Sequence, residues 1–339
     1  MIVDAHNHAL LTNARTKDSV FPAVDMTHLV SGMVAGGVVA MGLIVGGTVS
    51  FPVRQSPSCW QGTVDGLQRF WKGLETCEHD CLVIQHPRDV DQLSAETPGV
   101  LLGIEGWDCC LDAPTASPDE ALREFAQRGV RSVQPLGRQD SVAFRTAGPP
   151  HEDLSLSETG KALIRTARNL GMVVDVSHLS GDEPAFYEIV ERADTAVIAS
   201  HGVCRACSPL SAALSDDALR ALAGSGGVVG IHAGTRWLAG ESRRATVDDV
   251  LRHMEHVIEL VGLDHVAIGT DLVDVRVLPI DLPDHLFLEG LESLATMEIL
   301  SDAVRSLRLT TDEREQVLSR NVLRVWRNAL GPVSRSELP

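Results

Sequence analysis

Short apolar runs rich in valine and isoleucine recur along the whole chain, and longer stretches with helical spacing of apolar residues separate them. The eight runs occupy residues 1–6, 38–47, 100–106, 130–136, 172–178, 196–202, 227–233 and 265–272. Continuous apolar runs of this length are typical of strands that are buried on both faces, as in a parallel sheet. Strands of this kind, most of them followed by a helix, predict an α/β protein with the (β/α)8 TIM-barrel fold.

A doubly wound sheet also alternates strands and helices, and it is the alternative to a barrel. It is disfavoured because no glycine-rich phosphate-binding turn follows the first run. Helices are expected between the runs at residues 63–75, 117–129, 155–171, 215–226 and 246–262. Ser155 and Glu158 have the spacing of a capping box for the third of these. Two or three further helices are expected between residues 283 and 330, packed on the barrel.

The chain has 339 residues and contains no linker, low-complexity tract or internal repeat that would divide it. Barrels of this size are commonly single units. We therefore expect one domain over residues 1–330 and a flexible tail over residues 331–339.

The chain carries 29 lysines and arginines against 46 aspartates and glutamates, which gives a formal net charge of −17. This charge disfavours nucleic acid and anionic membranes as partners, because their phosphates would be repelled, and it leaves a small-molecule substrate. No stretch reaches the roughly 18 apolar residues that a membrane span requires, and the N-terminus lacks a secretory-signal pattern. We therefore expect a cytoplasmic protein whose seven cysteines are reduced.

Side chains that can bind metal lie where the predicted strands end. His6 and His8 close the first run, and both point to the same face because side chains alternate along a strand. Four other runs end in such a residue: Glu105, His178, His201 and Asp271. The C-terminal ends of all strands in a parallel barrel open onto one face, so these side chains are expected to converge there.

The four histidines also have an ordinary explanation, which the two carboxylates lack. His178 and His201 could cap strand ends by hydrogen bonding to the backbone, and His6 with His8 could be two polar residues at a strand end. Glu105 and Asp271 lie in apolar surroundings, where an unpaired carboxylate is costly, so each requires a cation. His232, at the end of the seventh run, is ambiguous and is left out of the metal-binding set.

Together the donors could hold one or two divalent ions. Nitrogen-rich ligation favours zinc, and a bridging carboxylate fits a pair of ions. A hydroxide that bridges two ions is a nucleophile near neutral pH, and an aspartate beside it can pass a proton to the leaving group. The residues thus predict hydrolysis of an amide, ester or related bond, with two zinc ions per chain.

Long, ordered segments of the chain resemble the renal (membrane) dipeptidase family of the amidohydrolase superfamily. The segments are LLGIEG, LSETGKALIRTARNLGMVVDVSHLS, VIASHGVCRA, GLDHVAIGTDL and SRNVLRVWR, and the similarity runs over nearly the whole length. The resemblance implies that His6 binds one ion and that Glu105 bridges both ions. It further implies that His178 and His201 hold the other ion, that Asp271 is the catalytic proton shuttle, and that the protein is a homodimer.

The chain departs from the family pattern at three places. His8 stands where the family usually has the aspartate of an H-x-D motif, and a neutral imidazole adds no negative charge to the site. Gly137 and Arg138 replace a substrate-contacting histidine, and Ala212 falls about where the family has an arginine that clamps the substrate carboxylate. Loss of that bidentate partner argues against ordinary dipeptide recognition. Other arginines are candidates to contact an anionic group in its place: Arg138, Arg145, Arg205 and Arg236.

The leading hypothesis is a zinc-dependent hydrolase of dipeptidase type that cleaves a C–N amide bond in a dipeptide or a related small amide. The first rival is another amidohydrolase reaction, such as that of a lactonase, deaminase or esterase, because barrels with an H-x-H motif catalyse all of these. The second rival is a barrel that binds metal or ligand without catalysis, and the complete donor set with Asp271 argues against it.

Overall fold

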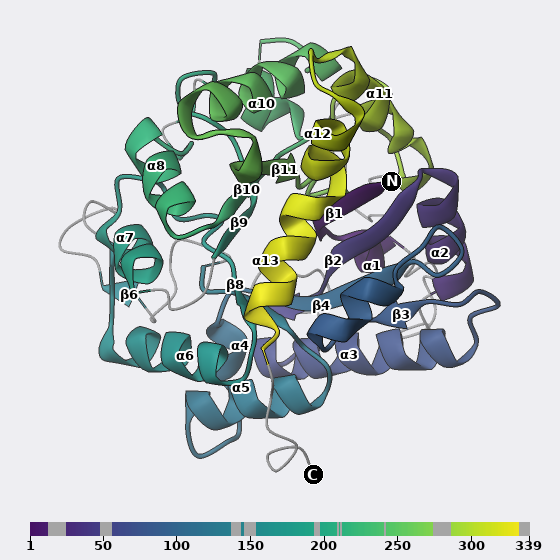
Figure 1. Ribbon diagram of the computed structural model, residues 1–339. Coiled ribbons are helices and arrows are strands. Elements are labelled where there is room, and N and C mark those ends of the chain that lie inside the picture. The colour runs from purple at the N-terminus through teal and green to yellow at the C-terminus, as the bar shows by residue number, and fades with distance from the viewer. Residues whose placement is uncertain are drawn as a thin grey trace.

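The computed structural model describes residues 1–12, 25–47, 56–136, 144–145, 154–192, 197–208, 210, 212–240, 242–273 and 286–331 (Figure 1). Parallel strands form the centre of the molecule. Their order is β8 (Val173–Val174), β5 (Ser132–Gln134), β4 (Gly99–Glu105), β2 (Val38–Gly47), β1 (Ile2–Asn7), β11 (Val266–Ile268), β10 (Val228–Ile231) and β9 (Ile198–Gly202). A parallel bridge between Asp175 and Ile198 joins β9 to the end of β8, so the ring of strands closes.

Each predicted apolar run overlaps one strand of this ring, and the predicted TIM-barrel fold is confirmed. The short strand β3 (Leu82–Val83) pairs with β4 outside the ring, and β6 (Phe144–Arg145) forms an antiparallel pair with β7 (Ser155–Leu156). These additions are too short for sequence periodicity to distinguish them from loops.

Helices surround the ring of strands (Figure 1). The longer ones are α2 (Met26–Ala35), α3 (Cys59–Glu75), α5 (Pro118–Gln127), α6 (Glu158–Asn169), α7 (Pro184–Glu191), α8 (Asp216–Gly224), α10 (Val247–Val261), α11 (Glu298–Ser306) and α13 (Asn321–Ala329). The shorter ones are α1 (Ala9–Thr12), α4 (Asp108–Leu111), α9 (Thr235–Ala239) and α12 (Thr311–Glu315). Short 3-10 helices are η2 (Pro87–Gln92), η3 (Leu263–His265) and η5 (Leu294–Thr296), and η6 (Gln316–Arg320) is a π-helical turn. In the described part of the chain, no helix combines the length and the apolar character that crossing a bilayer requires.

The core of the described residues consists of two clusters of buried apolar residues. The amphipathic helices form one of them by packing their apolar faces against the outside of the ring, and the other fills the inside of the ring. The inner cluster contains residues from the first half of most strands, among them Val3, Val39 and Leu101. The apolar face of α13, with Val322 and the fully buried Trp326, packs into the same cluster. Helix α13 therefore closes the barrel at the end where the strands begin (Figure 1).

Most predicted helix ends agree with the structure. Ser117, Ser215 and Thr246 are N-caps, as the sequence indicates. The capping box expected at Ser155 is wrong, because Ser155 belongs to β7, where it pairs with Arg145, and α6 is capped instead by Ser157.

A second difference concerns α3, which begins at Cys59, four residues before the predicted start. The side chain of Ser58 accepts a hydrogen bond from Gln61 N and caps it there. Residues 332–339, the greater part of the expected tail, lie outside the described residues.

Candidate metal centre

The six side chains that the sequence places at strand ends lie together in the structure. Each one sits at or just beyond the C-terminal end of its strand: His6 and His8 at β1, Glu105 at β4, His178 at β8, His201 at β9 and Asp271 at β11. This is the end of the barrel opposite to α13. Segments up to 265 residues apart along the chain thus meet because a closed parallel ring brings all its C-terminal ends to one rim.

Glu105 lies in the middle of the cluster, and its two oxygens divide the donors into two groups. Oε2 lies 3.3 Å from His6 Nε2 and 3.0 Å from His8 Nε2. Oε1 lies 3.1 Å from His178 Nε2, which is 3.1 Å from His201 Nε2. Each oxygen of the carboxylate therefore faces a different pair of imidazoles.

Asp271 completes the first group. Its Oδ1 lies 3.2 Å from His8 Nε2 and 3.7 Å from His6 Nε2, so three side chains direct ligand atoms into one small space. His178 and Asp271 each leave 27% of the side chain exposed, whereas Glu105 and His6 are almost fully buried. The open side of the centre is therefore the side that carries His178 and Asp271.

His178 and Asp271 share a second property. Among the described residues that are not glycine, they alone have a left-handed backbone, with φ of 69° for His178 and 55° for Asp271. This conformation is unfavourable for residues with a Cβ and persists where the surrounding structure imposes it, often at functional sites. The two exposed donors are thus held by a conformation that their own residue types do not favour.

Behind the imidazoles lies a polar network that the sequence did not reveal. Ser200 Oγ donates to Asp175 Oδ2 and lies 3.0 Å from the Nδ1 atoms of both His6 and His201. Asp175 Oδ1 accepts from the backbone N–H groups of Ser177 and Ser200. Asp175 also lies near His6 Nδ1 and His201, and the hydroxyl of Ser200 is hydrogen-bonded between them. Asp175 therefore supports the two imidazoles through this hydroxyl.

A second buried carboxylate, Asp4, connects β1 to the end of β11. It accepts hydrogen bonds from Asn7 Nδ2 at 2.8 Å, from Thr270 N at 2.8 Å and from Thr270 Oγ1 at 2.6 Å. Backbone bonds from Asp271 N to His6 O and from His8 N to Leu272 O continue the connection. Asp4 therefore fixes the position of Asp271 relative to the two histidines of β1.

His232, which sequence reasoning left out of the set, lies beside Asp271. Gly234 N–H donates to His232 Nδ1 at 2.7 Å, so the ring proton resides on Nε2, which lies 3.2 Å from Asp271 Oδ2. The ring stacks on Trp237 with centroids 5.4 Å apart. The only sequence signal for this role was its place at the end of the seventh run.

Burial and close neighbours act in opposite directions on the ionisable groups. Burial by itself raises the pKa of Glu105, but the imidazoles of His178, His6 and His8 hold that pKa well below its usual value. Burial likewise raises the pKa of Asp271, and His232 and His8 outweigh it, so that this pKa is also well below its usual value. Burial lowers the pKa of His8, but the carboxylates of Asp271 and Glu105 raise it to about 10. The centre thus holds ionised carboxylates in a buried place, which requires positive charge among them.

The residues fit a bound divalent metal. Glu105 Oε2 is buried and forms no hydrogen bond of good geometry, although two imidazole nitrogens lie close to it. The Nε2 atoms of four imidazoles lie together with the oxygens of Glu105, and imidazole nitrogen with carboxylate oxygen is a donor set that zinc and related ions prefer.

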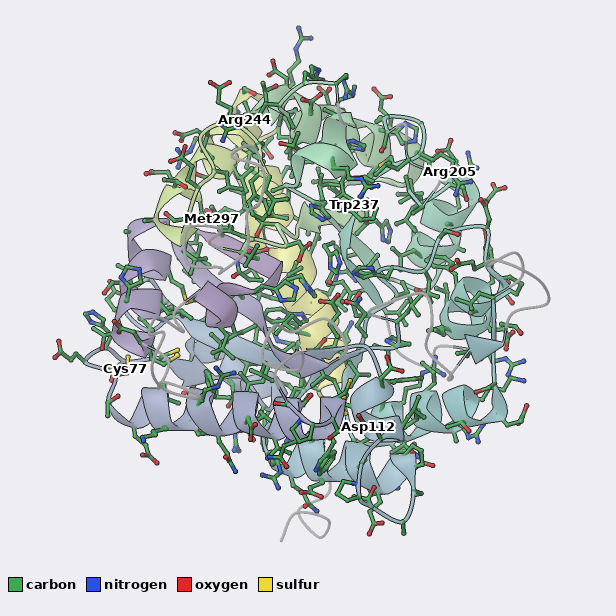
Figure 2. The ribbon with its side chains drawn as sticks, turned by 180° about the vertical axis from the view of Figure 1, so that it is seen from behind. Cys77, Asp112, Arg205, Trp237, Arg244 and Met297 are labelled. Carbon is green, nitrogen blue, oxygen red and sulfur yellow. The ribbon has the colours of Figure 1, made fainter. Side chains whose placement is uncertain are left out.

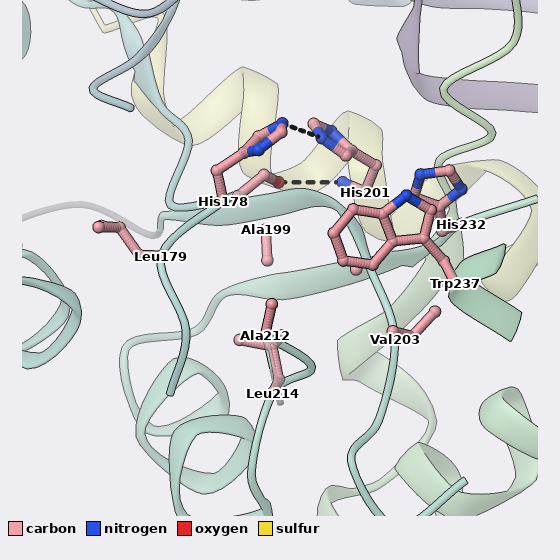
Figure 3. A pocket seen from close by; sticks show the side chains of 11 residues that line it. His178, Leu179, Ala199, His201, Val203, Ala212, Leu214, His232 and Trp237 are labelled. Atoms are coloured by element: carbon pink, nitrogen blue, oxygen red, sulfur yellow. Dashed lines mark hydrogen bonds between the residues drawn. The ribbon is translucent and has the colours of Figure 1, made fainter. Parts of the chain in front are cut away.

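A cavity of about 240 Å³ opens beside His178, His201 and His232 (Figure 3). Its remaining wall is largely apolar and includes Leu179, Val203, Ala212, Leu214 and Trp237. In Figure 3, Ala212 and Leu214 lie across the cavity from His178 and His201.

The arginines proposed as substrate contacts do not line this cavity in the described part of the chain. The guanidinium of Arg205 pairs with Asp182 at 2.6 Å and donates to Ala213 O, and Figure 2 shows Arg205 toward the rim of the molecule, away from Trp237. Arg236 lies on α9 and is exposed. Gly137, Arg138 and the side chain of Arg145 lie outside the described residues.

A family model matches nearly the full length of the chain, and individual relatives match about two thirds of it. The sequence model of the membrane dipeptidase family (peptidase family M19) matches residues 1–335. An uncharacterized protein of the pqqA 5' region of Klebsiella pneumoniae is 32% identical over 215 residues, which cover 61% of this chain and 75% of that protein. Dipeptidase tcpJ of Claviceps purpurea is 28% identical over 231 residues, which cover 67% of this chain and 50% of that protein. The chain thus spans about half the length of this fungal relative.

Solved structures share the fold. An amidohydrolase from Pseudomonas aeruginosa superposes with a TM-score of 0.76 at 19% identity, covering 98% of this chain and 97% of the other. A metallo peptidase from Rhodobacter sphaeroides, liganded with a phosphinate mimic of the dipeptide L-Ala-D-Ala, superposes with a TM-score of 0.74 at 20% identity, covering 97% and 99%. Because the family's sequence model matches almost every residue, this chain belongs to the membrane dipeptidase family, peptidase family M19.

Proposed function

We propose that the protein is a metal-dependent hydrolase that cleaves a C–N amide bond in a dipeptide or a related small amide. The observation that carries the proposal is the position of Glu105, whose two oxygens each face a pair of imidazoles at the mouth of the barrel. Membership of the membrane dipeptidase family supports the same reaction class.

Two zinc ions are the cofactor that suits these residues. His6 and His8 with Glu105 Oε2 would hold one ion, and His178 and His201 with Glu105 Oε1 would hold the other. Bound zinc supplies Lewis acidity, which makes water nucleophilic near neutral pH and polarises a carbonyl group.

Asp271 is the residue that moves the proton. Its carboxylate is kept ionised and lies on the open side of the centre, where it can accept a proton from the attacking water. The water oxygen forms a bond to the carbonyl carbon, the C–N bond breaks, and Asp271 delivers the proton to the leaving nitrogen. The products are a carboxylic acid and an amine.

His232 positions this carboxylate. Its Nδ1 accepts from Gly234 N–H, and its Nε2–H faces Asp271 Oδ2, so the ring favours the ionised form of Asp271 and restrains its orientation. The stack on Trp237 holds the ring in place.

The test is hydrolysis by the full-length protein after removal of metal with a chelator and reloading with zinc. We expect about two zinc ions per chain by elemental analysis, and turnover of members of a panel of dipeptides and N-acyl amino acids. Asp271→Asn should lower kcat by about 10²–10⁴-fold while zinc content stays unchanged, and the matched control Asp91→Asn, a surface carboxylate paired with Arg327, should not. A fully loaded protein that cleaves lactones or esters but none of the amides would overturn the proposal.

A further inference from the structure

The cavity beside the candidate metal centre has two chemically different ends. His178, His201 and His232 form one end, which is shared with the centre. The other end consists of the side chains of Leu179, Val203 and Leu214, all buried, with Ala212 exposed at the opening (Figure 3). A molecule whose reacting bond lies at the imidazoles must therefore place a neighbouring group against apolar carbon.

The position of Asp271 indicates which group this is. Asp271 Oδ2 lies 3.2 Å from His232 Nε2, and His232 lines the cavity next to Trp237. A leaving nitrogen that receives its proton from Asp271 therefore lies at this end of the centre. The substituent on that nitrogen is the part of the substrate that points into the cavity.

The charge of the wall decides what this substituent can be. Among the described residues that line the cavity there is no lysine or arginine. The nearby guanidinium of Arg205 pairs with Asp182 and bonds to Ala213 O. A carboxylate buried against these described residues would lose its hydration without gaining a cationic partner from them, which is strongly unfavourable, whereas an apolar group gains by burial.

We propose that the cavity binds an uncharged, apolar substituent on the amine side of the scissile amide, in place of the free carboxylate of an ordinary dipeptide. A cavity of about 150 Å³ is sufficient for benzene, so 240 Å³ has room for a branched aliphatic or phenyl group. The substrate class is therefore a small N-alkyl or N-arylalkyl amide, or a dipeptide whose carboxylate is blocked. This inference rests on the proposed amide hydrolysis.

The test uses a pair of substrates that differ by one carboxylate: L-leucyl-L-leucine and L-leucine isoamylamide. We expect the zinc-loaded protein to cleave the isoamylamide with a kcat/KM at least about tenfold higher, since leaving a charge unpaired in an apolar wall costs more than 1.4 kcal/mol. Ala212→Arg places a cation at the exposed opening and should narrow or invert this ratio. Ala212→Met, the matched control, adds bulk without charge. It should lower kcat/KM for both substrates and leave the ratio of the isoamylamide value to the leucyl-leucine value unchanged.

A binding measurement separates this inference from the proposed reaction. Calorimetry on Asp271→Asn, and on the same variant with Ala212→Arg, reports the affinity of both compounds while turnover is slowed. Tighter binding of the isoamylamide, reversed by Ala212→Arg, supports the cavity assignment even if no amide is ever hydrolysed. Equal or better cleavage and binding of leucyl-leucine by the unaltered protein, or identical behaviour of Ala212→Arg and Ala212→Met, would overturn it.

Discussion

The hydroxyl of Ser200 donates a hydrogen bond to the buried carboxylate of Asp175, on the neighbouring strand of the barrel. Since a hydroxyl has one proton, its lone pairs must accept from the Nδ1–H groups of His6 and His201, both 3.0 Å away. One serine therefore sets the tautomer of two imidazoles, and in both of them the lone pair of Nε2 points into the candidate metal centre.

Replacing this hydroxyl should weaken metal binding without removing a ligand. For Ser200→Ala we expect about a 10–100-fold loss of zinc affinity, the usual effect of losing a group that orients a ligand, measured by competition with a chromophoric chelator. Ser301→Ala is the matched control, because Ser301 is also buried and hydrogen-bonded but lies on α11, away from the centre. Equal zinc affinity in both variants would show that Ser200 does not fix the tautomers.

The position of Glu105 depends on Gly47. Its φ is 112°, and a Cβ at this position would lie 2.0 Å from the carbonyl oxygen of Glu105. Gly37 also has a left-handed φ of 68° but has open space where a Cβ would be. We expect Gly37→Ala to cost about 1–2 kcal/mol of unfolding free energy from backbone conformation alone. Gly47→Ala should cost clearly more and should also lower zinc affinity, because the backbone of Glu105 must move.

These two variants are compared by urea unfolding and by zinc titration. If Gly47→Ala binds zinc as tightly as Gly37→Ala does, the close contact between Gly47 and the backbone of Glu105 affects stability only. It then does not set the geometry of the centre.

Trp326 should carry much of the stability of the closed end of the barrel. It is 1% exposed and packs inside the ring of strands. We expect Trp326→Ala to lower the free energy of unfolding by about 3–5 kcal/mol, measured by urea denaturation. Arg327→Ala, on the exposed face of the same helix, removes a half-exposed ion pair with Asp91 and should cost less than about 1 kcal/mol. Similar losses of unfolding free energy in both variants would contradict the conclusion that α13 closes this end of the barrel.

His253 should make the protein sensitive to mild acid. Burial lowers its pKa to about 4, and its Nδ1 accepts a hydrogen bond from Cys204 N, which requires the neutral ring. Because the unfolded state binds a proton near pH 6.5 and the folded state only near pH 4, this residue costs stability progressively as the pH falls between those values. The full effect is on the order of 3 kcal/mol.

His253→Gln removes the titrating group, so the variant should lose less stability than the unaltered protein between pH 7 and pH 4.5. Urea midpoints at several pH values measure this. Parallel losses in the two proteins would show that other groups cause the acid sensitivity.

The amino-acid sequence by itself determined the number and place of the barrel strands, most helix ends and which candidate ligands stand at the strand ends. These are local signals: an apolar run, an N-cap serine or a histidine after a run can be identified without knowing what lies opposite. The expected capping box at Ser155 failed because pairing with Arg145 is not local.

Only the tertiary structure decided how the donors are divided between the two oxygens of Glu105, and that Ser200, Asp175 and His232 support them. It also decided that Arg205 is paired with Asp182 and that the wall beside the imidazoles is apolar. Each of these facts is a distance between residues far apart in the chain, and such distances are fixed only when the ring of strands closes and sets which side chains face one another.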